Sequence, residues 1–404
     1  MKKEIFQNGV RFLYKYREGE TSSFCIALEA GANRENDKNR GVAHALEHMV
    51  FKGTNKYDED EINRKLDELF AFNNAMTNFP YVIYYGVSLS EDFREGFDLY
   101  SNIVLNPSFN HEGFNEEISV IKEESREWKE DLEQYCEDLL LENAFPKERI
   151  SEIIIAKEES ISKITLEQIK QFYNKFYVSE NIVISVISSL SYEEVREIVY
   201  KNFGELEKKE VNNLDFDRKE IKSGTYIENQ NLGDTCKIQL AFDISSLSIE
   251  EITRLRIFNM FLGEGVSSLL YDEIRTKKGL AYEVYSEVKW EKGIRIFKII
   301  VNTSKKNREL VINSINDILK KIKSISKILD QKMINTLIKR FKLKLSLDIE
   351  RAIVAANRTA IYEILYNRYN ILFEELKFDE IITVNDIEAL IDKVFKDKVL
   401  MILE

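Results

Sequence analysis

Hydrophobic and polar positions along the first 90 residues follow two different periods. Residues 9–16 and 22–30 alternate apolar and polar side chains, which predicts two β-strands joined by a polar turn. From Val42 onward apolar residues recur at helical spacing, and a second amphipathic helix is expected over residues 58–72. Residues 75–89 are rich in aromatic and β-branched side chains, which predicts one long strand or a pair of strands.

The remainder of the chain continues as helices and strands, with one pattern that occurs twice. Residues 90–143 are strongly charged with apolar positions at helical intervals, which predicts a helical stretch. Residues 164–187 and 382–403 both run from Ile-Thr through an amphipathic helix into an apolar strand. Such a repeat indicates two domains of similar topology.

The repeat and a charged, aperiodic stretch between its copies define the expected organisation. We expect an N-terminal domain at 1–207, a linker at 208–223 and a homologous C-terminal domain at 224–404. The fold class is α+β, with two homologous α/β-sandwich-like domains, each a mixed, largely antiparallel sheet with helices.

Composition narrows the functional classes. The chain of 404 residues is acidic, with a formal net charge of -12, and an acidic chain is a poor partner for nucleic acid. No apolar run reaches the length of a membrane helix, and the start of the chain lacks the apolar segment that a signal peptide needs. Three scattered cysteines, Cys25, Cys136 and Cys236, are typical of buried thiols in a reducing compartment. We therefore expect a cytoplasmic protein that binds neither nucleic acid nor membrane.

The sequence RGVAHALEHMVFKGT, residues 40–54, contains two of the chain's three histidines. On a helix, His44 and His48 are about 40° apart in azimuth, so both imidazoles project from one side and can bind one zinc ion. Glu47 lies beside them and can act as general base toward a water that the metal polarises. This order is the inverted form, H-x-x-E-H, of a known zinc motif.

A catalytic zinc ion needs a third protein ligand, which this motif does not supply. The remaining histidine, His111, stands in a stretch expected to be a loop, and its role stays open. A carboxylate from the acidic helix after residue 112 is favoured. Glu117 and Glu124 share one helix face, as do Glu116 and Glu123, and helix geometry alone does not choose between the two pairs.

The motif closely resembles that of the M16 (pitrilysin or insulinase) family of zinc metallopeptidases, in its two-domain, processing-peptidase-like form. In that family the third ligand is a glutamate 76 residues after the second histidine, in a VIxEE-like stretch, which here is Glu124. A second glutamate seven residues earlier, here Glu117, helps to orient the catalytic site. The resemblance thus implies one Zn²⁺ per chain held by His44, His48 and Glu124, with Glu47 as general base.

The resemblance also implies how substrate is bound. Asn74 in NNAMT takes the position of the family's asparagine near the metal. Arg275 and Tyr282, seven apart in the second half, match residues that contact the substrate backbone near the scissile bond. The expected substrates are unfolded peptides or leader and presequence peptides.

Family members work as a clamshell of four homologous domains, of which this chain would supply half. The resemblance therefore implies a homodimer, or a heterodimer with a related M16 subunit. One alternative is a non-catalytic peptide-binding subunit of such a heterodimer, although an intact Glu47 argues against it. Another is a dedicated leader peptidase of a modified-peptide pathway.

Overall fold

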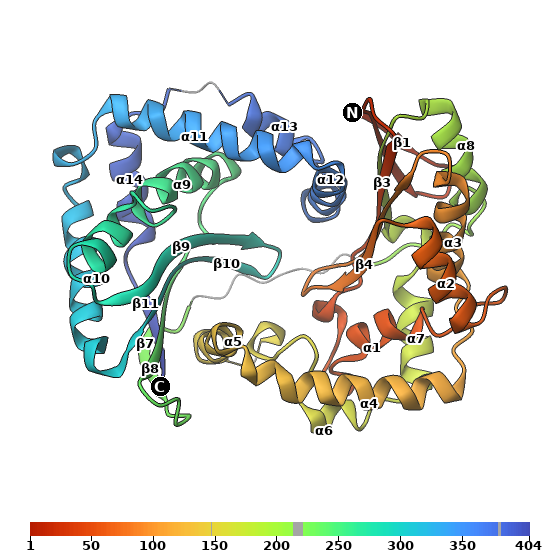
Figure 1. Cartoon of the computed structure of the whole chain (residues 1–404), viewed down its shortest axis with the longest axis horizontal. Helices are drawn as coiled ribbons and strands as arrows, with labels where there is room; N and C mark the ends of the chain where they lie inside the picture. Colours follow the sequence, from red (N-terminus) through yellow and green to blue (C-terminus); the bar gives the residue numbers. More distant parts are fainter. Residues whose placement is uncertain (147, 213–220, 379–380) are drawn as a thin grey trace. The chain divides into compact units, whose positions relative to one another are not determined.

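The computed structural model describes residues 1–146, 148–212, 221–378 and 381–404. Its contacts divide the chain into two compact units, each built from three stretches of sequence (Figure 1). The first unit comprises Met1–Arg126, Ile153–Asp215 and Ser346–Glu374, and the second comprises Glu127–Glu152, Phe216–Leu345 and Glu375–Glu404. Residues 213–220, within the expected linker at 208–223, lie outside the described residues. The division at that linker stays a prediction.

The first unit contains a six-stranded sheet of order β1-β2-β6-β3-β5-β4. Its strands are β1 (Lys2–Ile5), β2 (Arg11–Tyr16), β3 (Thr21–Leu28), β4 (Phe72–Thr77), β5 (Val82–Leu89) and β6 (Ile182–Ser188). β2 and β6 are parallel and the other neighbours are antiparallel. The segment 75–89 thus contributes to a strand pair, β4 and β5, rather than one long strand. β4 is an edge strand, with one side unpaired by the described strands.

Helices lie on both faces of this sheet, and β6 is accordingly buried along its whole length. The helices of this unit are α1 (Val42–Met49), α2 (Glu59–Leu69), α3 (Phe93–Leu105), α4 (His111–Glu127), α6 (Glu158–Ile161), α7 (Leu166–Phe176), α8 (Tyr192–Phe203) and α12 (Ala352–Tyr366). Of these, α1, α3, α8 and α12 contact its strands. Phe24 of β3 points to one face, where it contacts Phe93 and Phe97 of α3. Its neighbour Cys25 points to the other face, toward Ala355 of α12.

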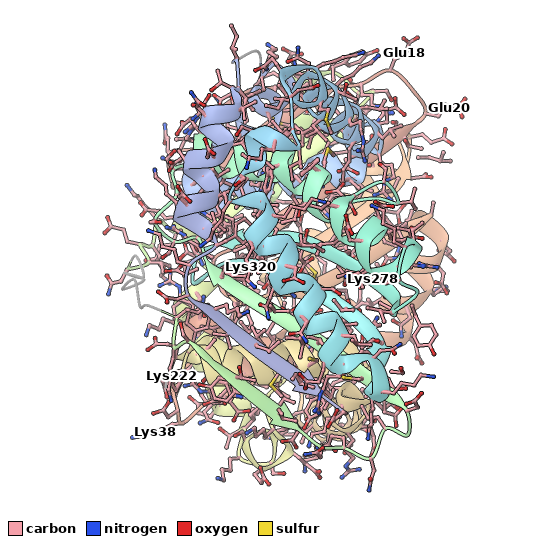
Figure 2. The ribbon with its side chains drawn as sticks, turned by 90° about the vertical axis from the view of Figure 1, so that its left-hand side faces the viewer. Glu18, Glu20, Lys38, Lys222, Lys278 and Lys320 are labelled. Atoms are coloured by element: carbon pink, nitrogen blue, oxygen red, sulfur yellow. The ribbon has the colours of Figure 1, made fainter. Side chains whose placement is uncertain are left out.

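The second unit contains a five-stranded sheet of order β7-β11-β8-β10-β9. Its strands are β7 (Gly224–Glu228), β8 (Thr235–Asp243), β9 (Ala281–Glu291), β10 (Ile294–Ser304) and β11 (Lys398–Leu403). Its helices include α5 (Leu132–Ala144), α9 (Ile249–Leu262), the π-helix η5 (Tyr271–Thr276), α10 (Arg308–Ile322) and α14 (Val384–Val394). Charged side chains such as Lys278 and Lys320 project from its surface (Figure 2). Two helices, α11 (Gln331–Glu350) and α13 (Ile371–Leu376), cross the boundary between the units.

The two sheets share one strand order. In the first sheet the order is β2-β6-β3-β5-β4, and in the second it is β7-β11-β8-β10-β9. In both sheets the first pair of strands is parallel and the later pairs are antiparallel. The repeated helix–strand segments are α7 with β6 and α14 with β11. Thr165 and Thr383 begin the two helices as N-caps, each in a capping box that satisfies otherwise unpaired backbone N–H groups. The mixed α/β fold with two similar sheets is therefore confirmed.

Each half of the sequence gives one helix to the unit formed mainly by the other half. α12, from late in the chain, packs on β3, β5 and β6 of the first unit, and α5, from the first half, packs on β7, β8 and β11 of the second. Ala355, Ala356 and Ala360 of α12 are buried against the first sheet. These small side chains allow helix and sheet to approach closely.

Both exchanged helices carry a buried glutamate that pairs with a strand lysine. Glu363 of α12 is fully buried, and its Oε1 lies 2.6 Å from Nζ of Lys3. Glu137 of α5 pairs with Lys298, whose side chain is 2 % exposed, and with Lys289. Removing one partner of a buried pair leaves an uncompensated charge, so these pairs discourage other placements of the helices.

The charged stretch 90–143 is not one continuous helical region. α3 ends at Leu105 and α4 begins at His111, with Pro107 in an isolated bridge to Thr54 between them. Asn110 ends the break, because its side chain accepts a hydrogen bond from Gly113 N at 2.6 Å and so caps α4. His111 is therefore the first residue of α4, and the expectation that it stands in a loop was wrong. None of the described helices has the length and apolar character that crossing a bilayer requires.

Candidate metal centre

The helix with both motif histidines starts at an unusual turn. Gly41 precedes α1 with φ at +86°, a left-handed conformation that favours glycine, and a Cβ there would lie 2.7 Å from the Ile155 carbonyl oxygen. The carboxylate of the buried Glu35 accepts hydrogen bonds from Gly41 N at 3.0 Å and Ala43 N at 2.9 Å. An anion at a helix N-terminus satisfies free N–H groups and complements the helix dipole. α1 is thereby fixed where the motif begins.

His44, His48 and Glu124 lie together in the first unit. Each offers one ligand atom within 4.8 Å of the others. Oε2 of Glu124, on α4, is 3.8 Å from His44 Nε2 and 3.7 Å from His48 Nε2. The imidazole centroids are 4.6 Å apart, so the i, i+4 spacing places both rings on one side of α1.

The geometry of this cluster fits a zinc ion. A tetrahedral ion with nitrogen and oxygen ligands at about 2.0–2.2 Å separates its ligand atoms by about 3.3–3.6 Å, close to the distances from Glu124. Oε2 of Glu124 is buried and has no hydrogen-bond partner among the described residues. A buried carboxylate oxygen is costly without a partner, and a cation between it and the two Nε2 atoms would supply one.

Glu117 contacts the opposite side of the His48 ring. Its Oε2 lies 2.7 Å from His48 Nδ1. A carboxylate only accepts hydrogen bonds, so Nδ1 donates, and in the neutral imidazole Nε2, 3.7 Å from Glu124 Oε2, carries the lone pair that a metal ion requires. Metal-binding histidines commonly have such a partner, which fixes the tautomer and the orientation of the ring.

The two histidines have opposite electrostatic environments. Burial, together with the neighbouring His48, lowers the pKa of His44 to about 3, so His44 is neutral at physiological pH. Burial also lowers the pKa of His48, but the Glu117 hydrogen bond and the charges of Glu124 and Glu47 outweigh it and raise the pKa overall. Conversely, the hydrogen bond with His48 lowers the pKa of Glu117, despite partial burial. Glu117 is therefore an ionised partner for His48.

Glu47 projects from α1 next to this cluster and has a partner on the sheet. Thr77, the last residue of β4, donates a hydrogen bond from Oγ1 to Glu47 Oε2 at 2.5 Å. Burial raises the pKa of Glu47, and the Thr77 bond and His48 only partly oppose that effect. A carboxylate of raised pKa is better suited to accept and return a proton near neutral pH.

Two other predicted or open positions lie outside the cluster. Asn74 is exposed on β4, where its Oδ1 accepts a hydrogen bond from Ala75 N at 2.8 Å. His111 is exposed at the start of α4 and is not a member of the cluster. Substrate binding by Asn74 stays a prediction.

Arg275 and Tyr282 belong to the second unit. Arg275 lies on η5, and its guanidinium is 4.9 Å from the centroid of the Tyr271 ring, a cation–π contact. Tyr282 follows at the start of β9 with 73 % of its surface exposed. Short π-helical turns are frequent at functional sites, but the contact of both residues with substrate stays a prediction.

Residues that support the centre were not identified from the sequence. Glu35 caps α1, Thr77 bonds Glu47, and Lys52 lies 3.5 Å from Glu117 Oε1. Each contact joins residues that are not neighbours on one helix face. The NNAMT motif includes Thr77 and is the one sequence signal that could have drawn attention to it.

Comparison with protein families covers most of the chain. Residues 11–158 match the family "Insulinase (Peptidase family M16)", and residues 163–334 match "Peptidase M16 inactive domain". The first match includes Glu47 and the three candidate metal ligands, His44, His48 and Glu124. The second match covers Arg275 and Tyr282.

Individual relatives and solved structures agree with these matches. An uncharacterized zinc protease of Bacillus subtilis is 27 % identical over 288 residues, which span 71 % of this chain and 69 % of that relative. The mitochondrial-processing peptidase subunit beta of Dictyostelium discoideum is 29 % identical over 57 % of this chain and 48 % of its own length. The crystal structure of a protease from Helicobacter pylori has a TM-score of 0.91 at 20 % identity, covering 100 % of this chain and 99 % of that one.

Fold and site together define a two-unit α+β protein whose first unit holds a His/His/Glu cluster with the spacing of a metal site, next to the half-buried carboxylate of Glu47. The chain belongs to peptidase family M16, the insulinase family.

Proposed function

We propose that this chain is a zinc-dependent endopeptidase in which Glu47 is the general base. The observation that carries the proposal is the position of Glu47 on α1 next to a cluster whose three ligand atoms have the spacing of a zinc site. Relatives named as zinc proteases support it. His44, His48 and Glu124 would hold the ion.

Zinc, when bound, would polarise the scissile carbonyl and lower the pKa of water at the site. The chain's own residues supply the proton transfer. Glu47 takes one proton from the water whose oxygen attacks the peptide carbonyl carbon. It then returns that proton to the amine nitrogen as the carbon–nitrogen bond breaks, and is again a carboxylate. The Thr77 hydroxyl would hold the Glu47 carboxylate in place through both transfers.

The substrates we propose are unfolded peptides, including leader and presequence peptides. β4 is an edge strand that ends at Thr77, and an extended peptide could add to its unpaired side through main-chain hydrogen bonds. Asn74 is exposed on this strand. By family resemblance Arg275 and Tyr282 would donate hydrogen bonds to the substrate backbone.

We further propose that the chain works as a dimer, because the family encloses its substrate between four domains and this chain supplies two. A homodimer is favoured, since one chain carries both the candidate metal residues and Arg275 with Tyr282. Size-exclusion chromatography with light scattering would test it, and a monomer under conditions of activity would contradict it. A heterodimer would instead require a second, related chain for activity.

Cleavage of a peptide library by three samples tests the catalytic proposal. Wild-type protein with zinc should cleave, and the chelated sample should not. Glu47→Gln should retain one zinc ion per chain and lose turnover by at least about 10²-fold, the lower range for a general base. Glu123→Gln, one residue from Glu124 but ion-paired with Arg126, is the matched control and should behave as wild type.

Three outcomes would change the proposal. If Glu47→Gln cleaves as fast as wild type, the mechanism is wrong. If the wild type binds zinc and peptide but cleaves no peptide in the library, the chain is a peptide-binding subunit instead. A restriction of cleavage to leader peptides of one class would favour the dedicated leader peptidase.

A further inference from the structure

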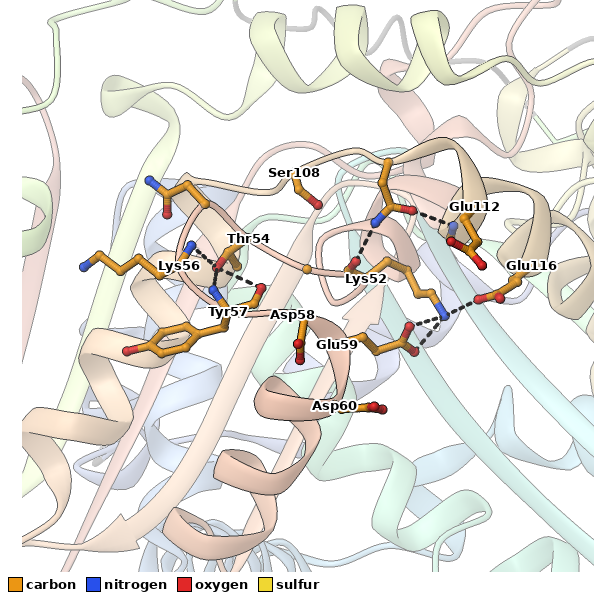
Figure 3. Close-up of a pocket in the computed structure, with 14 residues that line it drawn as sticks. Lys52, Thr54, Lys56, Tyr57, Asp58, Glu59, Asp60, Ser108, Glu112 and Glu116 are labelled. Carbon is orange, nitrogen blue, oxygen red and sulfur yellow. Dashed lines mark hydrogen bonds and ion pairs between the residues drawn. The ribbon is translucent and has the colours of Figure 1, made fainter.

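The side chain of Lys52 reaches into a ring of three carboxylates. Its Nζ lies 2.6 Å from Glu59 Oε2, 2.8 Å from Glu116 Oε2 and 3.5 Å from Glu117 Oε1. Figure 3 shows it between Glu59, at the start of α2, and Glu116, on α4, at the edge of a polar surface pocket of about 620 Å³. This pocket is not lined by the residues of the metal cluster.

Lys52 is held as a cation in this setting. Its side chain is only 10 % exposed, and burial lowers its pKa, but the bonds with Glu116 and Glu59 outweigh burial and raise the pKa well above the usual range. This half-buried ammonium is attracted to three carboxylates that lie within 3.5 Å of its Nζ. It therefore fixes the carboxylates around it.

Glu117 connects Lys52 to His48, one of the three candidate metal ligands. One of its oxygens, Oε2, accepts the hydrogen bond from His48 Nδ1 at 2.7 Å, while the other, Oε1, faces Lys52. With a partner on each oxygen, the plane of the carboxylate is set from both sides. Glu117 thus links the His48 ring to a lysine that does not touch the ring.

Lys52, near the end of the motif at residues 40–54, also contacts the start of α4. The Lys52 carbonyl accepts a hydrogen bond from Asn110 Nδ2 at 2.8 Å, and Asn110 caps α4. Gly113, in the first turn of α4, has no side chain where a Cβ would lie 2.9 Å from Lys52 Cβ and 3.1 Å from Lys52 Cε. α4 can therefore lie directly on the Lys52 stem, and α4 carries both Glu117 and Glu124.

We infer that Lys52 is a positioning residue of the metal centre: it orients His48 through Glu117 and sets the position of α4, which presents Glu124. The inference rests on the proposed function, because it concerns the same centre, but its test does not depend on turnover. Nothing in it requires Lys52 to touch metal or substrate.

A double-mutant cycle on zinc affinity tests the route through Glu117. Affinity is measured by competition with a chelator, on the full chain. Lys52→Gln should weaken zinc binding about tenfold, the lower range for a partner of a ligating histidine. In a Glu117→Gln background the same change should cost less than about threefold, because the route is already broken. An equal loss in both backgrounds would overturn the route through Glu117.

Glu59→Gln is the matched control, since it removes a Lys52 carboxylate partner that makes no contact with His48. It should leave zinc affinity within about twofold, and a loss as large as that of Lys52→Gln would assign the effect to the ion cluster as a whole. Substitution of cobalt(II) gives a second readout, because its visible spectrum should change in Lys52→Gln and not in Glu59→Gln.

Gly113→Ala is the substitute variant if Lys52→Gln does not fold. It keeps every charge, and its added methyl group displaces the aliphatic part of the Lys52 side chain. It should also weaken zinc binding several-fold, with thermal unfolding of the metal-free chain measured alongside. Unchanged zinc affinity in every Lys52 and Gly113 variant that folds would overturn this inference and leave the proposed function standing. Absence of zinc binding by the wild type would overturn the proposed function, and this inference with it.

Discussion

The hydroxyl of Thr77 and the carboxylate of Glu47 are joined by a hydrogen bond of 2.5 Å between the last residue of strand β4 and helix α1. This bond connects the edge strand on which we propose that peptide binds to the group that we propose transfers the proton. Because the donor, Thr77, is the last residue of β4, the strand proposed to bind peptide also positions the carboxylate proposed to transfer the proton.

Thr77→Val should lower kcat about tenfold or more with little change in KM or zinc content. Valine has nearly the same shape but no hydroxyl, so Glu47 loses the donor that orients it while strand β4 keeps its packing. Steady-state kinetics with metal analysis would measure this. Thr77→Ser should restore most of the rate, and a Thr77→Val enzyme with wild-type kcat would show that the hydrogen bond is dispensable.

Glu124→Gln should lose zinc, whereas Glu123→Gln should retain it. Glu124 Oε2 faces both imidazoles, while Glu123 is directed to Arg126 in an exposed ion pair. Metal content after gel filtration, measured by atomic emission, separates the two variants. The opposite result would move the third ligand to Glu123, an alternative that helix geometry alone left open.

Breaking the buried pair under α5 should destabilise the second unit. Glu137→Ala leaves the buried Lys298 with Glu287 as its remaining carboxylate partner among the described residues, and loss of one partner of a buried pair costs about 3–5 kcal/mol. Hydrogen exchange followed by mass spectrometry should show faster exchange in residues 132–144 and in β10. The exposed Glu130→Ala is the control, and equal protection in both variants would count against a role in docking α5.

Asp138 should make stability depend on pH. Burial raises its pKa to about 6 from an ordinary 3.8, although hydrogen bonds from Trp128 and Gln134 oppose the shift. Between these pH values the folded chain binds the proton and the unfolded chain does not, so the contribution of Asp138 to stability falls as pH rises from about 4 to 6 and stays low above that.

Asp138→Asn should therefore stabilise the chain at pH 7 and have little effect near pH 4. The expected gain is about 1–2 kcal/mol, since Asp138 is partly exposed. Chemical denaturation at both pH values would measure it. An equal effect at pH 4 and pH 7 would exclude titration of Asp138 as the cause.

The sequence predicted local structure better than long-range placement. His44 and His48 share one side of α1 because a fixed helical period places i and i+4 together, which a single sequence reveals. Glu124 could be selected only by family resemblance, since several glutamates of α4 have equivalent local patterns. Glu35 and Lys52 gave no distinct signal, and Thr77 was marked only by its place in NNAMT, because the roles of all three depend on contacts between separate elements.

The exchanged helices were missed for a related reason. Nothing in the sequence of α5 or α12 specifies which of two similar sheets each helix will cover. The helical pattern does not mark Glu137 or Glu363 as buried, and it is the strand lysines paired with them that balance their buried charges. The repeat at 164–187 and 382–403 suggested two similar domains, but it did not indicate that they trade elements.

The packing of α12 on a sheet formed by the first half of the chain has a consequence for synthesis of the protein on the ribosome. When residues up to 212 have emerged, the first sheet has all six of its strands, yet one apolar face still lacks its cover. The cover is helix α12, residues 352–366, which is synthesised about 140 residues after residue 212. The unit with the candidate metal centre therefore exposes an apolar sheet face, a surface to which chaperones bind, until residues 352–366 have also left the ribosome.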